Sequence, residues 1–367
     1  GAAFLALLAA ITFFFPNNIE RIWLIYGLDP CQPHKNYYFD HYQETYNCYY
    51  DKTSKIVYNE GTQAGLEYME QVVSPKTNFG LSHIIMHEVG HEAWHSTESL
   101  DIALARAPDV ETLEEYWKVD GFVHGVFHGY FEHEYNETPI ADMVKGCSDY
   151  PMEIQNSQLH PVEKLKALDC FHAMGHGMMS RNGNKVGKSI KDCDLIQGDD
   201  ARHMCYYGAF MENAYLYLPF YFPEAPRPDV KGAHSLHVCA NYTADKLRWC
   251  ALFPAWSLVL QGSQVEDAFK ICGSFLDIEA RKACIQLPSK HMLPRQKKGD
   301  YEQILDTCLA LSDELEGTCI QWASNGIRQG VAGYGKNIRE FCAIVPRQYQ
   351  GTCLNTHPYL ESNLATN

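Results

Sequence analysis

The fourteen cysteines recur at a spacing that constrains the fold more than any other feature of the chain. From Cys193 onward they form five pairs whose members are 12, 11, 12, 11 and 11 residues apart. Counted from Cys170, the second members follow one another after 35, 45, 34, 35 and 34 residues. A period in this range is typical of an array built from one repeated supersecondary unit. We therefore expect the 367 residues to form an elongated repeat array rather than two or three unrelated domains.

Each unit is predicted to contain two helices joined by a short turn. In the unit 301–330, Ser312 and Asp313 are N-cap candidates at the turn, with Cys308 shortly before it and Cys319 shortly after it. Two such positions face each other in a helical hairpin, so a disulfide can link them. We therefore expect five disulfides on this plan: Cys193–Cys205, Cys239–Cys250, Cys272–Cys284, Cys308–Cys319 and Cys342–Cys353. The hairpin plan does not fix the connectivity of the other four cysteines, for which Cys147–Cys170 and Cys31–Cys48 would complete the set.

Metal ligation is the alternative role for paired cysteines. Zinc sites of this kind contain closely spaced CxxC pairs, but the chain has neither CxxC nor the CxxCH of c-type haem attachment. We therefore favour disulfides, which form in oxidising compartments such as a periplasm, an organelle lumen or the cell exterior.

The predicted fold is all-α, an array of disulfide-stapled helical hairpins. It resembles Sel1-like and tetratricopeptide solenoids in general form, although the cysteine spacing is longer than in Sel1-like proteins. The resemblance implies a curved array of helix pairs with a concave face. The expected divisions are an anchor helix at 1–28, a linker segment and first helix at 29–80, histidine-rich repeats at 81–218, a proline-rich loop at 219–238 and scaffold repeats at 239–367.

The first fifteen residues, GAAFLALLAAITFFF, contain no charged side chain and end before Pro16. A membrane span needs about 20 apolar residues, so this run is slightly short of one. It indicates a transmembrane anchor, with the apolar core of an uncleaved signal peptide and a buried terminal helix as alternatives. We favour the anchor, which would attach the protein to a membrane and leave its main body in the oxidising compartment.

Histidines in the first half of the chain repeat in the register of the cysteines. Aligned on Cys170, the segment CFHAMGHG has histidines at offsets +2 and +6, and the segments 122–129 and 85–92 have them at the same offsets. Histidines four residues apart lie on one helix face, and equivalent positions of successive repeats line one surface. We expect three pairs to converge there: His87 and His91, His124 and His128, and His172 and His176.

Six converging imidazoles predict a centre for one or two transition-metal ions, because imidazole is a ligand of zinc, copper and iron. His95 extends the first helix face, and Glu132 and Glu212 are further candidate ligands. An uncoordinated polar pocket, a pH-sensing interface and plain packing are the alternatives. We favour metal because polar imidazoles in three matching pairs are a costly way to fill a core.

Residues 87–91, HEVGH, match HExxH and resemble the active-site helix of zinc metallopeptidases. The resemblance implies zinc bound by His87 and His91, with Glu88 as general base to the bound water. It covers five residues, and the metzincin extension is absent because Ala93 and Trp94 stand where that pattern continues. HEVGH is also one copy of the histidine repeat, which is the origin that we favour.

A net charge of −15 argues against a nucleic-acid-binding protein, because phosphate neutralisation needs basic surface. Three function classes remain. We favour a membrane-anchored, extracytoplasmic metalloprotein that handles a metal ion or uses it in redox chemistry. A zinc hydrolase acting through Glu88 is the first alternative. The second is a structural or accessory subunit whose repeats bind protein partners in a membrane or surface assembly.

Overall fold

The computed structural model describes residues 31, 42–72, 79–108, 117–133, 140–149, 161–216, 234–261, 263–290, 292, 301–330 and 336–355. Within these ranges the chain forms helices, turns and short connections, with no strand, which confirms the all-α prediction for this part of the chain. The predicted anchor at 1–28 lies outside them. None of the described helices has both the length and the apolar character needed to cross a bilayer.

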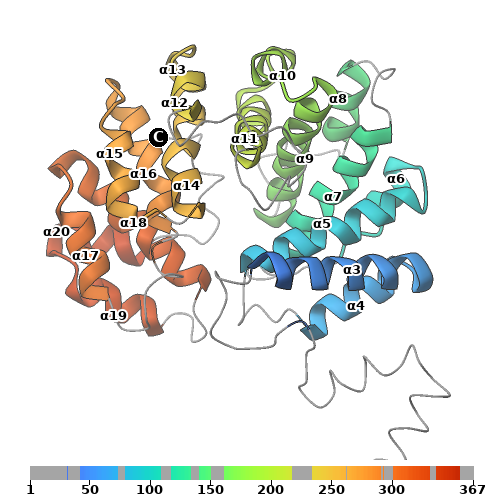
Figure 1. The fold of residues 1–367 in the computed structure, drawn as a ribbon, viewed down its shortest axis with the longest axis horizontal. Coiled ribbons are helices and arrows are strands. Elements are labelled where there is room, and N and C mark those ends of the chain that lie inside the picture. Colours follow the sequence, from blue (N-terminus) through green and yellow to red (C-terminus); the bar gives the residue numbers. More distant parts are fainter. Residues whose placement is uncertain are drawn as a thin grey trace, which may run out of the picture.

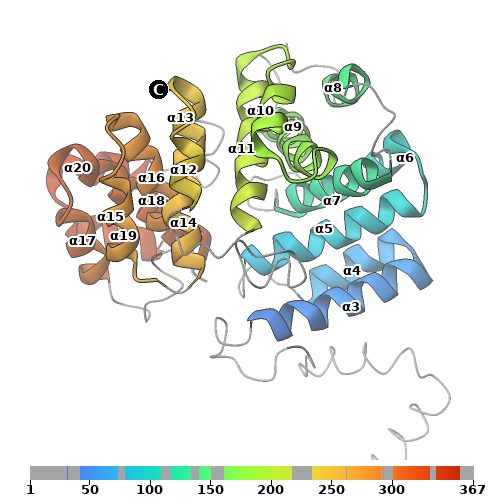
Figure 2. The ribbon, with the colours of Figure 1, turned by 45° about the horizontal axis from the view of Figure 1, so that its top comes forward.

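The first half of the described chain forms one group of helices, at the right of Figure 1. Its long helices α5, α7, α9 and α11 pack in chain order, each against the next, and Figure 2 shows this succession from a second direction. Helix α3 packs against both α4 and α5. The bounds are α3 Tyr42–Glu60, α4 Thr62–Val72, α5 Phe79–His95, α6 Leu100–Leu104, α7 Trp117–His133, α8 Ile140–Asp149, α9 Pro161–Arg181, α10 Val186–Cys193 and α11 Asp199–Tyr215.

The second half forms another group, at the left of Figure 1, in which α14, α16, α18 and α20 pack in chain order. Helix α11 contacts α13 and α14, and these contacts join the two groups. The bounds are α12 His234–Cys239, α13 Ala244–Ala251, α14 Phe253–Leu260, α15 Val265–Cys272, α16 Ile278–Lys290, α17 Tyr301–Leu309, α18 Asp313–Gly330, α19 Lys336–Ile344 and α20 Arg347–Leu354.

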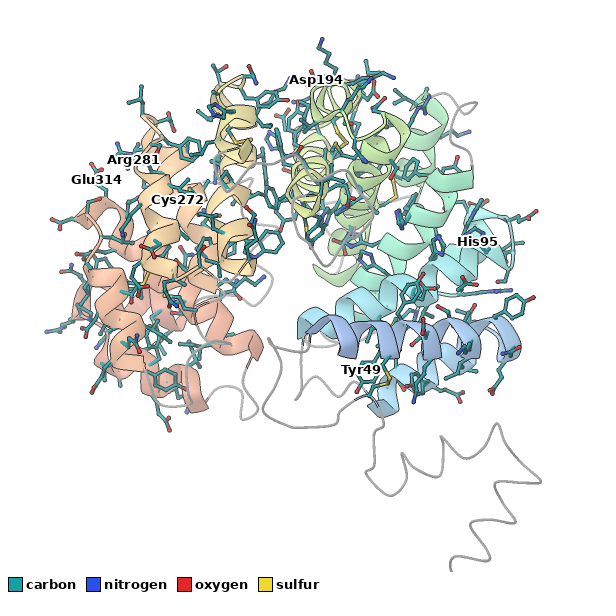
Figure 3. The ribbon with its side chains drawn as sticks, viewed as in Figure 1. Tyr49, His95, Asp194, Cys272, Arg281 and Glu314 are labelled. Atoms are coloured by element: carbon teal, nitrogen blue, oxygen red, sulfur yellow. A yellow bond between two sulfur atoms is a disulfide. The ribbon has the colours of Figure 1, made fainter. Side chains whose placement is uncertain are left out.

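All seven predicted disulfides are confirmed. Six of them join a short helix to the helix that follows it, as the hairpin argument requires, and the seventh ties Cys31 to α3. The linked Cα atoms are 5.4 to 5.7 Å apart, which is the ordinary distance for a disulfide. Cys272 at the end of α15 is labelled in Figure 3. Seven disulfides are typical of a protein that resides in an oxidising compartment.

Helix α7 lies between α5 and α9 and is therefore buried on more than one face. Residues 121–127 of this helix are all buried. Its large apolar side chains lie along one broad stripe, at the spacing of a core-facing helix: Val119, Phe122, Val123, Val126, Phe127 and Phe131. Any polar side chain that α7 carries between these residues is consequently held inside the protein.

Prolines account for the main departures from a regular hairpin. In the unit that contains Cys250, the second helix is divided into α13 and α14, with Pro254 in the first turn of α14. Proline is favoured there because the first turn needs no backbone N–H donor. Residues 219–233 of the predicted proline-rich loop lie outside the described residues. Its remaining residues, 234–238, belong to α12.

Candidate metal centre

Glycines allow two of the histidine-bearing helices to approach until their backbones touch. A Cβ atom on Gly90 of α5 would lie 1.9 Å from the carbonyl oxygen of Phe122, and one on Gly125 of α7 would lie 1.8 Å from that of His87. No side chain larger than hydrogen fits such a gap, so the crossing requires glycine on both helices. It brings His87 of α5 against α7, where His124 is one residue from the crossing glycine.

A second crossing of the same kind joins α9 and α11. A Cβ atom on Gly175 of α9 would lie 2.3 Å from the carbonyl oxygen of Cys205, and one on Gly208 of α11 would lie 2.0 Å from that of His172. Because α7 packs between α5 and α9, the two crossings bring the histidines of three helices together.

Four imidazoles from α5, α7 and α9 form a continuous chain of contacts, which we call the inner cluster: His87, His124, His172 and His176. Nε2 of His87 lies 3.0 Å from Nδ1 of His124. The rings of His124 and His172 have centroids 4.3 Å apart, and Nε2 of His172 lies 3.1 Å from Nε2 of His176. His124, His172 and His176 are only 2%, 5% and 8% exposed, so these imidazoles are interior groups.

Two buried carboxylates border the inner cluster. Asp169 of α9 is 7% exposed, and one oxygen of its carboxylate lies within 4.8 Å of ring nitrogens of His124 and His172. Oε2 of Glu212 on α11 lies 2.8 Å from Nδ1 of His176. The three groups His124, Asp169 and His172 could together hold a metal ion.

The short nitrogen-to-nitrogen contacts restrict the protonation of the inner cluster. Two imidazole nitrogens about 3 Å apart need either a proton or a cation between them, since each lone pair repels the other. Around a tetrahedral ion with ligand distances near 2.1 Å, neighbouring ligand atoms are about 3.4 Å apart. The contacts at 3.0 and 3.1 Å have the length of a hydrogen bond between two ring nitrogens and are shorter than the spacing of two ligands on one ion.

A second set of histidines lies toward the C-terminal end of α5, and we call it the outer cluster: His91, His95 and His128. Nε2 of His91 lies 3.3 Å from Nε2 of His95, and the rings of His91 and His128 have centroids 5.7 Å apart. His91 and His128 are half-buried, whereas His95, labelled in Figure 3, is exposed. Oε1 of Glu92 lies 3.8 Å from Nδ1 of His91.

Glu88, the expected general base, makes its closest contact on the α3 side of α5. Oγ of Ser54 on α3 donates a hydrogen bond to its carboxylate. Burial raises the pKa of Glu88, while the Ser54 hydrogen bond and the nearby His91 act against this rise. A carboxylate oxygen of Glu88 also lies within 4.8 Å of donor atoms of His91 and Glu92. The contacts of the two motif histidines diverge, because His87 meets His124 and His91 meets His95.

Sequence reasoning named every imidazole of both clusters but missed Asp169. This residue precedes His172 by three positions, and residues three apart share a helix face, so the spacing could have revealed it. Glu132 belongs to α7, but its side chain lies outside the described part of the structure. Tyr207 of α11 also borders the inner cluster, because its ring centroid lies 4.7 Å from that of His172.

Comparison of the chain with protein-family models, with curated protein sequences and with solved structures finds no match. The function of the chain must therefore be inferred from the residues of the site itself.

Proposed function

We propose that this protein is an extracytoplasmic metalloprotein that holds a transition-metal ion in the inner cluster. The observation that carries the proposal is the packing of four imidazoles and two carboxylates between α5, α7, α9 and α11. Contacts of 3.0 and 3.1 Å between ring nitrogens support it, because they bring the donor atoms of different histidines within reach of one ion. Burial of so many polar groups is costly unless they bind something.

In this proposal His124, Asp169 and His172 are ligands, and His87 and His176 supply the remaining imidazoles within reach. Glu212 has a supporting role, because its carboxylate accepts a hydrogen bond from Nδ1 of His176 and leaves Nε2 to face His172. A carboxylate behind a metal-bound histidine fixes its tautomer and its orientation.

The donor set fits zinc, copper or iron better than calcium or magnesium. Imidazole nitrogen suits the later first-row transition metals, whereas calcium and magnesium prefer sites made only of oxygen. The surrounding apolar core excludes water, which favours either tight storage and delivery of the ion or its use as a redox centre. Tyr207, packed against His172, would adjoin such a redox ion.

The proposed setting follows from the disulfides and from the N-terminal segment. The uncharged run at residues 1–15 would attach the protein to a membrane, and the disulfide-linked body would lie in the oxidising compartment. In this proposal helices α12–α20 form an array of helical hairpins like that of solenoid proteins. The array would supply a surface for protein partners. Its helices carry none of the inner-cluster residues, so this role is separate from metal binding.

Elemental analysis tests the proposal. The full chain is purified without a nickel column, and zinc, copper and iron are counted per chain before and after reconstitution. We expect at least one equivalent in the native protein and its loss in a His124→Ala, His172→Ala double variant. His237→Ala is the control because this histidine is exposed on α12. Absence of metal after reconstitution, or an unchanged content in the double variant, contradicts the proposal.

A zinc hydrolase acting through Glu88 is the second candidate. The observation that favours it is the buried carboxyl of Glu88 between His87 and His91, with a raised pKa that suits a general base. Against it, Glu88 contacts Ser54 of α3 while the two histidines have different partners. Glu88→Gln separates the candidates: a hydrolase loses turnover of peptide or ester substrates while retaining zinc, whereas a storage or redox centre is unaffected.

A further inference from the structure

The outer cluster is a group of histidines that the inner centre does not use. His91 and His95 are four residues apart on α5, and their Nε2 atoms are 3.3 Å apart. Their ring centroids are 4.4 Å apart with the planes nearly perpendicular. Two imidazoles one helical turn apart can chelate a single ion. The third imidazole, that of His128 on α7, has its ring centroid 5.7 Å from that of His91, so it lies near enough to serve as a further ligand.

The outer cluster differs from the inner cluster in exposure. His95 is exposed in the last turn of α5, and the side chain of His91 is 19% exposed. An exposed histidine fills no core, so packing does not account for the position of His95. Glu92, with a side chain that is 22% exposed, places a carboxylate oxygen 3.8 Å from Nδ1 of His91. The cluster therefore presents imidazole donors and one carboxylate at the edge of the protein.

We infer that the outer cluster is a second metal site, which binds a divalent transition-metal ion through His91, His95 and His128 and exchanges it with solvent. The inference rests on the proposed function for the choice of ion but uses a separate set of residues. Zinc, copper(II) and cobalt(II) suit a site of imidazoles with an adjacent carboxylate. Because water reaches His95, an ion bound there leaves and returns more readily than an ion in the buried inner cluster.

The two sites would thus differ in lability although α5 and α7 contribute histidines to both. His87 and His91 on α5, like His124 and His128 on α7, are four residues apart, which is about 6 Å along the helix axis. An ion in the outer cluster would therefore lie one turn from the inner cluster. The protein would hold one ion firmly in its core and another loosely at its edge.

Cobalt(II) binding to the full-length, metal-stripped protein tests this inference. Equilibrium dialysis gives the number of ions and their dissociation constants, and visible absorption reports their coordination. We expect two equivalents in the wild type, with the weaker one removed by His95→Ala and, independently, by His128→Asn. Its dissociation constant should rise at least about 10-fold, because even indirect contacts to a metal contribute that much. His237→Ala is the matched exposed-histidine control.

The outcomes separate this inference from the proposed function. One equivalent in the wild type, unaffected by His95→Ala and lost in His172→Ala, overturns the second site but leaves the inner centre standing. Loss of the bound ion in His95→Ala with no change in His172→Ala supports the outer site and overturns the inner centre. If a chelator removes both bound ions at the same rate, the two sites do not differ in how fast they exchange their ions, and this part of the inference is contradicted. Because His95 is exposed, its substitution does not disturb the fold, and circular dichroism verifies this.

Discussion

Nδ1 of His176 lies 2.8 Å from Oε2 of Glu212, while Nε2 of the same ring lies 3.1 Å from Nε2 of His172. The carboxylate cannot donate when ionised, so Nδ1 of His176 carries the proton and donates it. This hydrogen bond assigns the tautomer of His176 and leaves the lone pair of its Nε2 directed at His172. In the proposed centre Glu212 would therefore orient one imidazole toward the metal ion without being a ligand itself.

Replacing Glu212 by alanine should weaken metal binding without abolishing it. Removal of a carboxylate that orients a metal-bound histidine typically lowers metal affinity by about 10- to 100-fold. We expect a loss of this size for zinc in competition with a chelating dye. Glu279→Gln is the control, since Glu279 is on the surface of α16 and pairs with Lys282. An affinity for Glu212→Ala within twofold of the wild type would mean that Glu212 has no orienting role.

Zinc should stabilise the wild type against unfolding by an amount that depends on the inner cluster. At a free zinc concentration 100 times the dissociation constant, mass action adds about 2.7 kcal/mol to the free energy of unfolding. Urea denaturation with zinc and with a chelator measures the difference. The gain should disappear in His172→Ala. An equal gain in wild type and variant would place the stabilising ion elsewhere.

The glycine crossing of α5 and α7 gives a prediction about stability and metal binding together. A Cβ on Gly125 would meet the carbonyl oxygen of His87 at 1.8 Å and the backbone nitrogen of His91 at 2.8 Å. Gly125→Ala must force the two helices apart, at a cost of about 2–3 kcal/mol. It should also separate His87 from His124 and so lower zinc affinity. Thermal unfolding and dye competition measure the two effects.

Gly187 provides the matched control for this substitution. It lies in α10, where an added Cβ would meet only the hydroxyl of Tyr242, at 4.0 Å. Alanine is a better helix former than glycine, so Gly187→Ala should raise the free energy of unfolding by about 0.5–1 kcal/mol. If both variants behaved alike, the close approach of α5 and α7 would not matter to the site.

The cysteine period was sufficient to predict the helical hairpins and the five disulfides from Cys193 onward, because a bridge across a hairpin turn is a local feature. The period did not fix Cys147–Cys170 and Cys31–Cys48, whose members are 23 and 17 residues apart. The histidine register likewise indicated which helix faces carry imidazoles. The division into an inner and an outer cluster could not be derived from it, since that division depends on how deeply α7 is buried between α5 and α9. The contact of Glu88 with Ser54 joins residues of different helices, and no spacing along one helix reveals it.

Asp194 should contribute stability that depends on pH. Partial burial acts to raise its pKa, but hydrogen bonds from Lys246 and Tyr206 outweigh burial and hold the pKa below the ordinary value of 3.8. A lowered pKa in the folded state means that the contribution is present above pH 3.8 and is lost as the pH falls through the folded value. The side chain is 38% exposed, so solvent screening limits the contribution to less than about 1 kcal/mol.

Urea denaturation of Asp194→Asn at pH 7 and at pH 3 tests this sign. The variant should be less stable than the wild type at pH 7, and the difference should shrink at pH 3. Asp267→Asn is the control, because Asp267 and its partner Lys270 are both well exposed and should contribute nothing measurable. A difference that grows as the pH falls would show that the pKa of Asp194 is raised on folding.

Two disulfides should be alike in their effect on stability and different in their effect on metal binding. Cys308–Cys319 and Cys147–Cys170 close loops of 11 and 23 residues, and the loss of either should cost about 2–4 kcal/mol. Cys170 lies two residues before His172 on α9, whereas α17 and α18 carry no inner-cluster residue. Serine variants at Cys147 and Cys170 should therefore lower zinc affinity about 10-fold or more, while those at Cys308 and Cys319 leave it unchanged. If the serine variants of the two disulfides lost zinc equally, the two helical groups would unfold as one unit. If both sets of variants retained zinc, α9 would keep its position without the Cys147–Cys170 bridge.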